Sequence, residues 1–302
     1  MSTTQKTEDK SKESLSTAWQ DPAIAERYAR NEAATRPYAD ILLDKASVVT
    51  SIKQHNTTIN ALDFGCGTGA VTAALYSKVP RSHWPNVQVL GGDISQPMLT
   101  YLQNRGEQNG WPGLTTQLLD GTNLHLAPNQ FTHVFANAII FFLPLGALAK
   151  LFHSLQPRGY IGITTWAAIN WYPLVERAIN SLPNPPPLLP LSAVRGMMQQ
   201  NNAWHEPGFV RQQLEEAGFA DVDVVVEKRI VELGTPEQFC ESLRLPLMMF
   251  ESLWEEGRKE VILEEVMRAL RRVMGEEAGE AGKCYMAMEW VVGSGWKPSV
   301  EK

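Results

Sequence analysis

Three aspartates each stand at or just after the end of a short apolar run, where a carboxylate could hold a polar ligand. They are Asp63 near the end of residues 60–64, Asp93 at the end of residues 87–93, and Asp120 after residues 114–119. Each run is short enough to be a strand, and doubly wound sheets bind ligands at the carboxyl ends of their strands. Carboxylates at this edge can accept hydrogen bonds from ammonium, hydroxyl or amine groups.

Glycine occupies every second position directly after the first of these strands, at Gly65, Gly67 and Gly69. Glycine adopts positive φ without steric cost, and its missing Cβ lets a ligand lie against the backbone. Residues 70–78 have the composition of a helix, whose N-terminus offers N–H groups and a partial positive charge. The order strand, glycine loop, helix predicts the first half of a βαβ unit that suits a carboxylate or a phosphate.

Two kinds of cofactor fit this loop. Gly65, Gly67 and Ala70 match the dinucleotide fingerprint G-x-G-x-x-G/A. However, Asp63 stands two residues before the first glycine, where it would repel a pyrophosphate, and Gly69 extends the series to D-x-G-x-G-x-G. An acid at this position suits a cationic ligand end better, such as the amino group of a methionine moiety.

The loop resembles motif I of the class I S-adenosylmethionine-dependent methyltransferases. The string G-D-I-S-x-x-M-L that begins at Gly92 is similar to the second motif of the same family. The resemblance covers residues 59–165 closely and the rest of the chain loosely. It implies an α/β fold with a doubly wound, seven-stranded, mostly parallel Rossmann-like sheet and helical cap insertions. Its last strand would enter antiparallel between the fifth and sixth.

The same resemblance implies S-adenosyl-L-methionine as the cofactor. Asp93 would accept both ribose hydroxyls, Asp120 would receive the adenine amino group, and Asn137 would lie near the sulfonium. The cofactor-binding residues that the resemblance implies are Tyr28, Asp63, Phe64, Gly65, Cys66, Gly67, Gly69, Asp93, Ile94, Met98, Asp120, Gly121, Thr122 and Asn137.

The chain outside the predicted sheet divides into a tail and three added segments. Residues 1–17 are polar and charged, and we expect them to be disordered. Residues 18–302 would form a single methyltransferase domain, with N-terminal lid helices at 18–49, separated near Arg36-Pro37, and cap insertions at 170–207 and 235–280. Tyr28 in the lid is a candidate cofactor or substrate contact, although core packing of an amphipathic helix explains it equally well.

Composition narrows the class of protein. The 302 residues carry a formal net charge of −6 and no long basic block, which disfavours nucleic acid as the main partner. No apolar run reaches the roughly 18 residues of a membrane span, and the N-terminus lacks the apolar region of a secretory signal. The three cysteines form no CxxC pair, so we expect no metal site, no disulfide framework and a cytoplasmic location. The oligomeric state stays open.

Aromatic residues and methionines in the cap segments predict an apolar small-molecule acceptor. Candidate substrate contacts are Phe141, Trp166, Trp171, Tyr172, Trp204 and Met248. The chain is similar to fungal secondary-metabolite methyltransferases, including those acting on thiols or nitrogen atoms. We therefore expect methyl transfer from S-adenosylmethionine to a thiol, nitrogen or oxygen of a natural-product-like acceptor.

The catalytic residue is not identified by the sequence. A thiolate or neutral amine needs little beyond positioning, whereas a phenol needs a base. The candidate bases are His205, His133 and His125, in that order. Two other functions stay open: a methyltransferase-fold enzyme that uses S-adenosylmethionine for a reaction such as cyclisation, and an NAD-dependent oxidoreductase.

Overall fold

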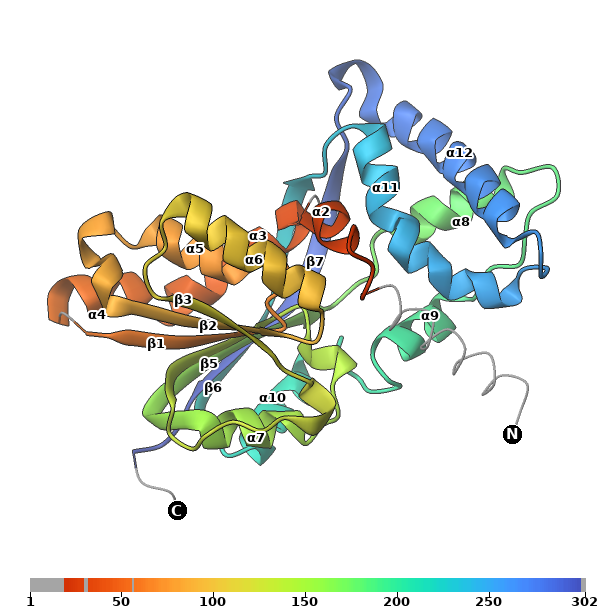
Figure 1. The fold of residues 1–302 in the computed structure, drawn as a ribbon. Helices are drawn as coiled ribbons and strands as arrows, with labels where there is room; N and C mark the ends of the chain where they lie inside the picture. Colours follow the sequence, from red (N-terminus) through yellow and green to blue (C-terminus); the bar gives the residue numbers. More distant parts are fainter. Residues whose placement is uncertain (1–18, 30–31, 56, 300–302) are drawn as a thin grey trace. The chain divides into compact units, whose positions relative to one another are not determined.

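The computed structural model of the chain describes residues 19–29, 32–55 and 57–299 (Figure 1). The tail expected at residues 1–17 lies outside these ranges. Close contacts group the chain into two compact units. We call the described residues within Met1–Ala34, Ile169–Asn201 and Arg229–Met288 the helical unit, and those within Thr35–Ala168, Asn202–Lys228 and Glu289–Lys302 the sheet unit.

The sheet has seven strands in the order β3-β2-β1-β4-β5-β7-β6. They are β1 (Ile59–Phe64), β2 (Val87–Asp93), β3 (Leu114–Leu118), β4 (Phe131–Asn137), β5 (Leu155–Trp166), β6 (Ala220–Glu232) and β7 (Tyr285–Trp296). Strands β1 to β5 pair in parallel, whereas β7 is antiparallel to β5 and lies between β5 and β6. The predicted fold class and the place of the last strand are therefore confirmed.

Helices of the sheet unit cover both faces of this sheet. The helices α3 (Glu32–Lys45), α4 (Val48–His55), α5 (Ala70–Lys78) and α6 (Gln96–Asn109) lie on one face, and α7 (Ala147–Ser154) and α10 (Pro207–Glu216) lie on the other (Figure 1). The central strands β1 and β4 are accordingly buried along almost their whole length.

The lid was expected to break near Arg36-Pro37, and this expectation was wrong. Helix α3 continues through Pro37 and ends at Lys45. Pro37 is the sixth residue of α3 and removes one backbone hydrogen bond, and the buried side chains of Tyr38, Ala39, Leu42 and Leu43 offset this loss by packing in the core. The chain turns instead at Ser47, which has a φ of 51° and whose N–H donates to the Asp44 carbonyl.

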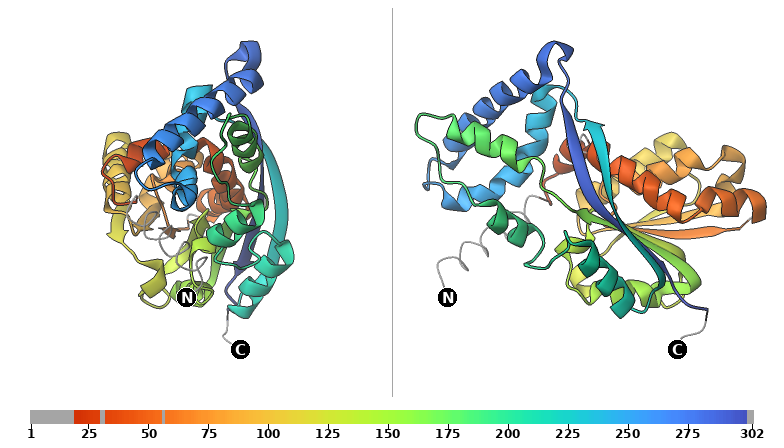
Figure 2. Two further views of the ribbon diagram at one scale, coloured as in Figure 1. Left: turned by 90° about the vertical axis from the view of Figure 1, so that its right-hand side faces the viewer. Right: turned by 180° about the vertical axis from the view of Figure 1, so that it is seen from behind.

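The helical unit contains α2 (Ile24–Ala29), α8 (Tyr172–Asn180), α9 (Leu191–Met198), α11 (Pro236–Leu247) and α12 (Lys259–Ala278). Helix α12 packs against both α8 and α11 (Figure 2). The proline-rich segment between α8 and α9 is held by two long side chains. The Tyr172 hydroxyl donates to the Leu189 carbonyl at 2.8 Å, and the Trp254 indole donates to the Pro187 carbonyl at 3.2 Å.

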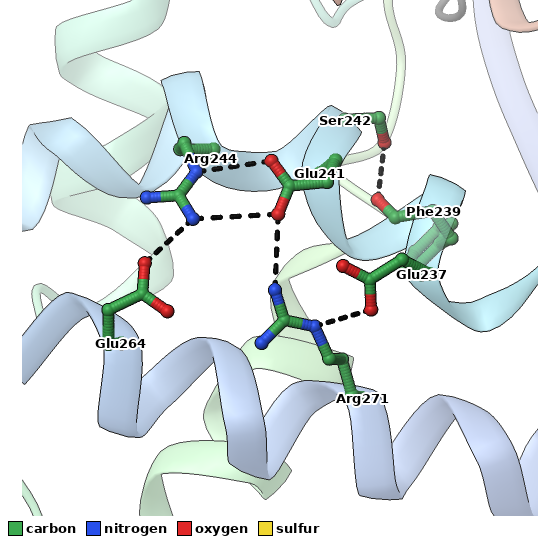
Figure 3. A network of polar contacts seen from close by, with 7 residues as sticks. All are labelled: Glu237, Phe239, Glu241, Ser242, Arg244, Glu264 and Arg271. Atoms are coloured by element: carbon green, nitrogen blue, oxygen red, sulfur yellow. Dashed lines mark hydrogen bonds and ion pairs between the residues drawn. The ribbon is translucent and has the colours of Figure 1, made fainter.

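A network of charged side chains joins α11 to α12 (Figure 3). Arg244 pairs with Glu241 on its own helix and with Glu264 on α12, where the shortest distance is 2.8 Å. Arg271 on α12 pairs with Glu237 at 2.6 Å and with Glu241 at 3.1 Å. Because Glu241 accepts from both arginines, these four ion pairs form one connected group between the two helices.

The predicted lid and caps do not coincide with the helical unit. The helical unit holds most of these residues, but residues 35–49 and 202–207 belong to the sheet unit. The expectation of a single domain with a lid and two caps therefore stays a prediction.

Candidate active site

The glycine loop joins β1 to α5 and has the backbone conformation that its sequence predicts. Gly65, Gly67 and Gly69 have φ values of 66°, 50° and 91°. The N–H groups of Gly65 and Cys66 both donate to the Gly92 carbonyl, at 2.7 and 3.1 Å. The loop is therefore fastened to the end of β2, so that the two motifs form one edge of the sheet.

Asp63 connects β1 to the first turn of α5. Its side chain is buried, and its Oδ2 accepts hydrogen bonds from Thr72, at 3.1 Å from the backbone N–H and 2.7 Å from the hydroxyl. The carboxylate therefore stabilises the strand–loop–helix turn itself. Its contact with a ligand amino group stays a prediction.

Asp93 is the carboxylate that links the two motifs. Its Oδ2 accepts from the Gly67 N–H at 2.8 Å, and its Oδ1 accepts from the Ser95 N–H at 2.9 Å. Burial raises the pKa of Asp93 above its ordinary value, although these backbone hydrogen bonds oppose the shift. The carboxylate is thus held in one orientation at the carboxyl end of β2.

Large apolar side chains are exposed at the carboxyl ends of β2, β3 and β4. Ile94 directly follows Asp93 and is 49% exposed. Leu118, which pairs with Asp93 in the register of β2 and β3, is 58% exposed. Phe142 and Leu145, beyond the end of β4, are 40% and 41% exposed. A carboxylate flanked by exposed apolar side chains suits a ligand that joins polar hydroxyls to a flat apolar ring. The residues present therefore fit an adenosine group.

Asp120 caps the short turn after β3. Its Oδ1 accepts from the Thr122 N–H at 2.8 Å and from the Thr122 hydroxyl at 2.7 Å. These bonds lower the pKa of Asp120, the hydroxyl contributing most, and the side chain is exposed. The carboxylate is therefore ionised near neutral pH and can accept a further hydrogen bond from an amine.

The end of β4 is held by a threonine on β5 that the sequence analysis did not single out. The Thr164 hydroxyl on β5 donates to Asn137 Oδ1 at 2.7 Å and accepts from the Ala138 N–H at 2.9 Å. Asn137 Nδ2 donates to the Thr35 carbonyl at 3.2 Å, and Ala138 has a φ of 63°. Thr164 therefore fixes both the side chain of Asn137 and the sharp turn after it.

Several predicted cofactor contacts are buried side chains. Phe64, Cys66 and Met98 are at most 5% exposed. Burial raises the pKa of the Cys66 thiol well above its ordinary value, and the nearby Asp63 and Asp93 carboxylates raise it further. Cys66 is therefore a neutral thiol, and any contact of these three residues with a ligand would run through the backbone.

The predicted substrate residues fall in both units. Phe141 and Trp204 belong to the buried core of the sheet unit. Trp166 is half-buried, and its ring centroid lies 4.9 Å from that of Trp290, which stacks on Tyr38. The rest lie in the helical unit: Trp171, Tyr172 and Met248, together with the predicted lid residue Tyr28, which contacts Trp19.

The three candidate bases are in different surroundings. His205 is half-buried, and its Nε2 lies 3.3 Å from Glu206 Oε1. His125 is exposed and contacts the Asn123 carbonyl. His133 is buried in β4 between aromatic rings, and burial lowers its pKa to about 4. His133 is therefore neutral at physiological pH and packs in the core.

Buried His133 predicts a pH dependence of stability. A histidine with a lowered pKa binds its proton more readily in the unfolded chain, so stability falls as pH drops from the ordinary value of 6.5 towards about 4. Between about pH 7.5 and pH 5 this loss is roughly 2 kcal/mol. Urea unfolding should show it in the native protein and not in His133→Phe. The exposed control His125→Asn should keep it, and equal pH dependence in all three proteins would contradict the assignment.

No group of three or more His, Cys, Asp or Glu side chains in the described residues is placed to hold a metal ion. None of the described helices has the length and apolar character that crossing a membrane requires.

The part of the chain that contains both motifs matches a known protein family. The methyltransferase-domain family matches residues 61–159. Methyltransferase tpcH of Aspergillus fumigatus is 24% identical over 94% of this chain and 100% of its own length. Acetylaranotin bis-thiomethyltransferase of Aspergillus terreus is 25% identical over 95% of this chain and 99% of its own.

Solved structures that resemble the chain have lower sequence identity to it. Haemonchus contortus phosphoethanolamine N-methyltransferase 2, in complex with S-adenosyl-L-methionine, is 17% identical over 80% of this chain with a TM-score of 0.46. This chain spans 49% of that protein.

The sheet order is that of a Rossmann-like fold, and the segment that matches the methyltransferase-domain family lies within it. The family match and the fungal relatives confirm the resemblance to the class I S-adenosylmethionine-dependent methyltransferases that the two motifs indicate.

Proposed function

We propose that the protein binds S-adenosylmethionine and transfers its methyl group to a thiol, nitrogen or oxygen atom of an apolar, natural-product-like small molecule. The observation that carries the proposal is the Asp93 carboxylate, which the Gly67 N–H holds beside the exposed side chains of Ile94 and Leu118. Similarity to a bis-thiomethyltransferase supports a thiol among the acceptor atoms.

Each motif residue has a proposed role that its position supports. Asp93 would accept the two ribose hydroxyls, since a carboxylate can take both bonds at once. Ile94 would lie against the adenine ring, and Asp120 would accept its amino group. The backbone of Gly65, Gly67 and Gly69 would lie against the amino-acid end of the cofactor, beside the N-terminus of α5.

The bound cofactor supplies a methyl group on a positively charged sulfur. The side chains of this protein would contribute mainly by binding, orientation and exclusion of water, which can account for a large part of the barrier reduction. Thr164 would keep Asn137 and the following turn in place at the end of β4. A thiol or amine acceptor would then need no dedicated base, and His205 stays the candidate for an acceptor that does.

The acceptor would meet aromatic side chains. We propose Trp166 as a substrate contact in the sheet unit and Met248 as one in the helical unit. Phe141, Trp171, Tyr172 and Trp204 are at most 5% exposed, so any influence of these four on the substrate would come from packing. The methyltransferase relatives do not favour cyclisation or NAD-dependent redox chemistry as alternatives.

Calorimetric titration with S-adenosylmethionine, S-adenosylhomocysteine and NAD(H) tests the cofactor. We expect micromolar binding of the first two and none of NAD(H). Mass spectrometry of thiol, amine and phenol acceptors incubated with the protein and S-adenosylmethionine then tests transfer. Binding of NAD(H) alone would overturn the proposal, and cofactor binding with conversion of an acceptor that gains no methyl group would favour the cyclisation alternative.

A further inference from the structure

A groove of about 530 Å³ in the sheet unit is rich in arginine and borders the glycine loop through Arg105. Three separate elements supply the arginines: Arg36 from α3, Arg81 from the 3₁₀ helix η1 (Arg81–Asn86), and Arg105 from α6. The other lining residues come from α5, from η1, from the end of α6 and from the residues directly after α5 and α6. None of the lining residues is acidic, and none is a predicted cofactor contact.

The floor of this arginine groove is a rigid aromatic cluster. The Tyr76 ring stacks on Trp111 with centroids 5.1 Å apart and meets Trp84 edge-on at 5.3 Å. The Trp84 indole donates to the carbonyls of Tyr76 and Val79. Tyr76 is buried, and its hydroxyl accepts from the Gly113 N–H. The cluster therefore presents a fixed surface.

Two of the guanidinium groups lie over these rings. Arg81 is 5.1 Å from the Trp84 centroid, and Arg105 is 5.8 Å from that of Trp111. Arg105 also donates to the Thr68 carbonyl at 3.0 Å. Rings and carbonyls orient a guanidinium without changing its charge. Arg36, the third, has its Nε 3.5 Å from Asp40 Oδ2, and Asp40 lies 3.7 Å from Lys78 as well.

The local charge is opposite to that of the whole protein, which is −6. Positive groups that converge on one concavity repel one another, and a bound anion removes this repulsion. Guanidinium groups match phosphate oxygens in geometry and can donate two parallel hydrogen bonds. The volume is in the range of small-molecule sites.

We propose that the arginine groove binds a small phosphorylated molecule at a site separate from that of the methyl donor. The bond from Arg105 to the Thr68 carbonyl places one side of this site directly against the glycine loop. An anion that draws Arg105 towards itself therefore acts on the segment that precedes α5.

Calorimetric titration of the full-length protein with inorganic pyrophosphate tests the site. We expect saturable binding of one pyrophosphate per chain. Arg81→Gln and Arg36→Gln should each weaken it about tenfold, the effect of losing one charge-assisted hydrogen bond. Arg81→Lys should weaken it less because the charge remains. Arg158→Gln is the matched control: Arg158 is an exposed arginine of the sheet unit outside the groove, and this variant should bind as the native protein does.

Further titrations distinguish a soluble phosphate compound from a lipid headgroup and check that the variants are folded. ADP should compete with pyrophosphate, whereas vesicles containing phosphatidylglycerol should not retain the protein. S-adenosylhomocysteine should bind native protein and Arg81→Gln equally, which separates this site from the proposed cofactor site. The proposal is overturned by absence of pyrophosphate binding, by equal affinity in Arg81→Gln and Arg158→Gln, or by retention on vesicles alone.

Discussion

Gly65→Ala is expected to destabilise the sheet unit by about 2–5 kcal/mol. Gly65 has a φ of 66°, and a left-handed conformation costs an alanine about 1–2 kcal/mol. Its Cβ would also stand 2.4 Å from Ile139 Cγ1 and 2.7 Å from Ile139 Cβ. A change of rotamer cannot move the Ile139 Cβ, so the backbone must shift, and such overpacking costs about 1–3 kcal/mol more.

Gly110 at the end of α6 provides a matched control for this substitution. Its φ is 67°, but no atom lies within 4 Å of the position that a Cβ would take. Gly110→Ala should therefore show only the backbone part of the loss, about 1–2 kcal/mol. Urea unfolding of both variants measures the difference, and equal losses would show that contact with Ile139 does not constrain the loop.

Asp93→Ala is expected to lower the affinity for S-adenosylhomocysteine by about 1–3 kcal/mol, or roughly 5- to 150-fold. The substitution removes the proposed acceptor of the ribose hydroxyls. It also removes the bond that holds the Gly67 N–H at 2.8 Å, so the glycine loop loses its link to the carboxyl end of β2. Calorimetric titration measures the affinity.

Two further variants separate binding from folding. Asp93→Asn keeps a carbonyl oxygen for the Gly67 N–H and removes the charge, so its affinity should lie between those of the native protein and Asp93→Ala. Ser95→Ala removes the hydroxyl that accepts from the Met98 N–H at the start of α6. This should reduce stability by about 1 kcal/mol and leave affinity unchanged. Native affinity in Asp93→Ala would exclude the ribose role.

The sheet was predictable because its signals are local. Apolar runs that end in an acid or are followed by a glycine indicate β1 and β2, and the predicted run at residues 87–93 is the range that β2 occupies. The family resemblance supplied the antiparallel entry of the last strand, which pairing of β5 with β7 confirms. No local signal in the chain could have placed that strand between two that precede it.

The partners of individual site residues were not predictable. The sequence gives no sign of a partner for Asp63, but the Thr72 hydroxyl, nine residues later, donates a hydrogen bond to its carboxylate. Thr164 has an ordinary place in an apolar strand, and only the parallel register of β4 and β5 brings its hydroxyl to Asn137. Trp204 reads as a substrate contact because it is aromatic, yet it is 1% exposed, since α10 and the sheet enclose it. Such contacts depend on how distant segments pack.

The position of β7 in the sheet has a consequence for synthesis on the ribosome. β7 follows every other strand along the chain but lies between β5 and β6, and from Trp290 to Trp296 it pairs with β5. Until these residues have left the exit tunnel, β5 presents an open edge of unpaired backbone groups, and β6 has no neighbour in the sheet. From the emergence of β5 until that of β7, a nascent chain therefore carries an aggregation-prone edge. Closure of this edge is accordingly a late event in the folding of the sheet unit, because it waits for the strand that is synthesised after all the others.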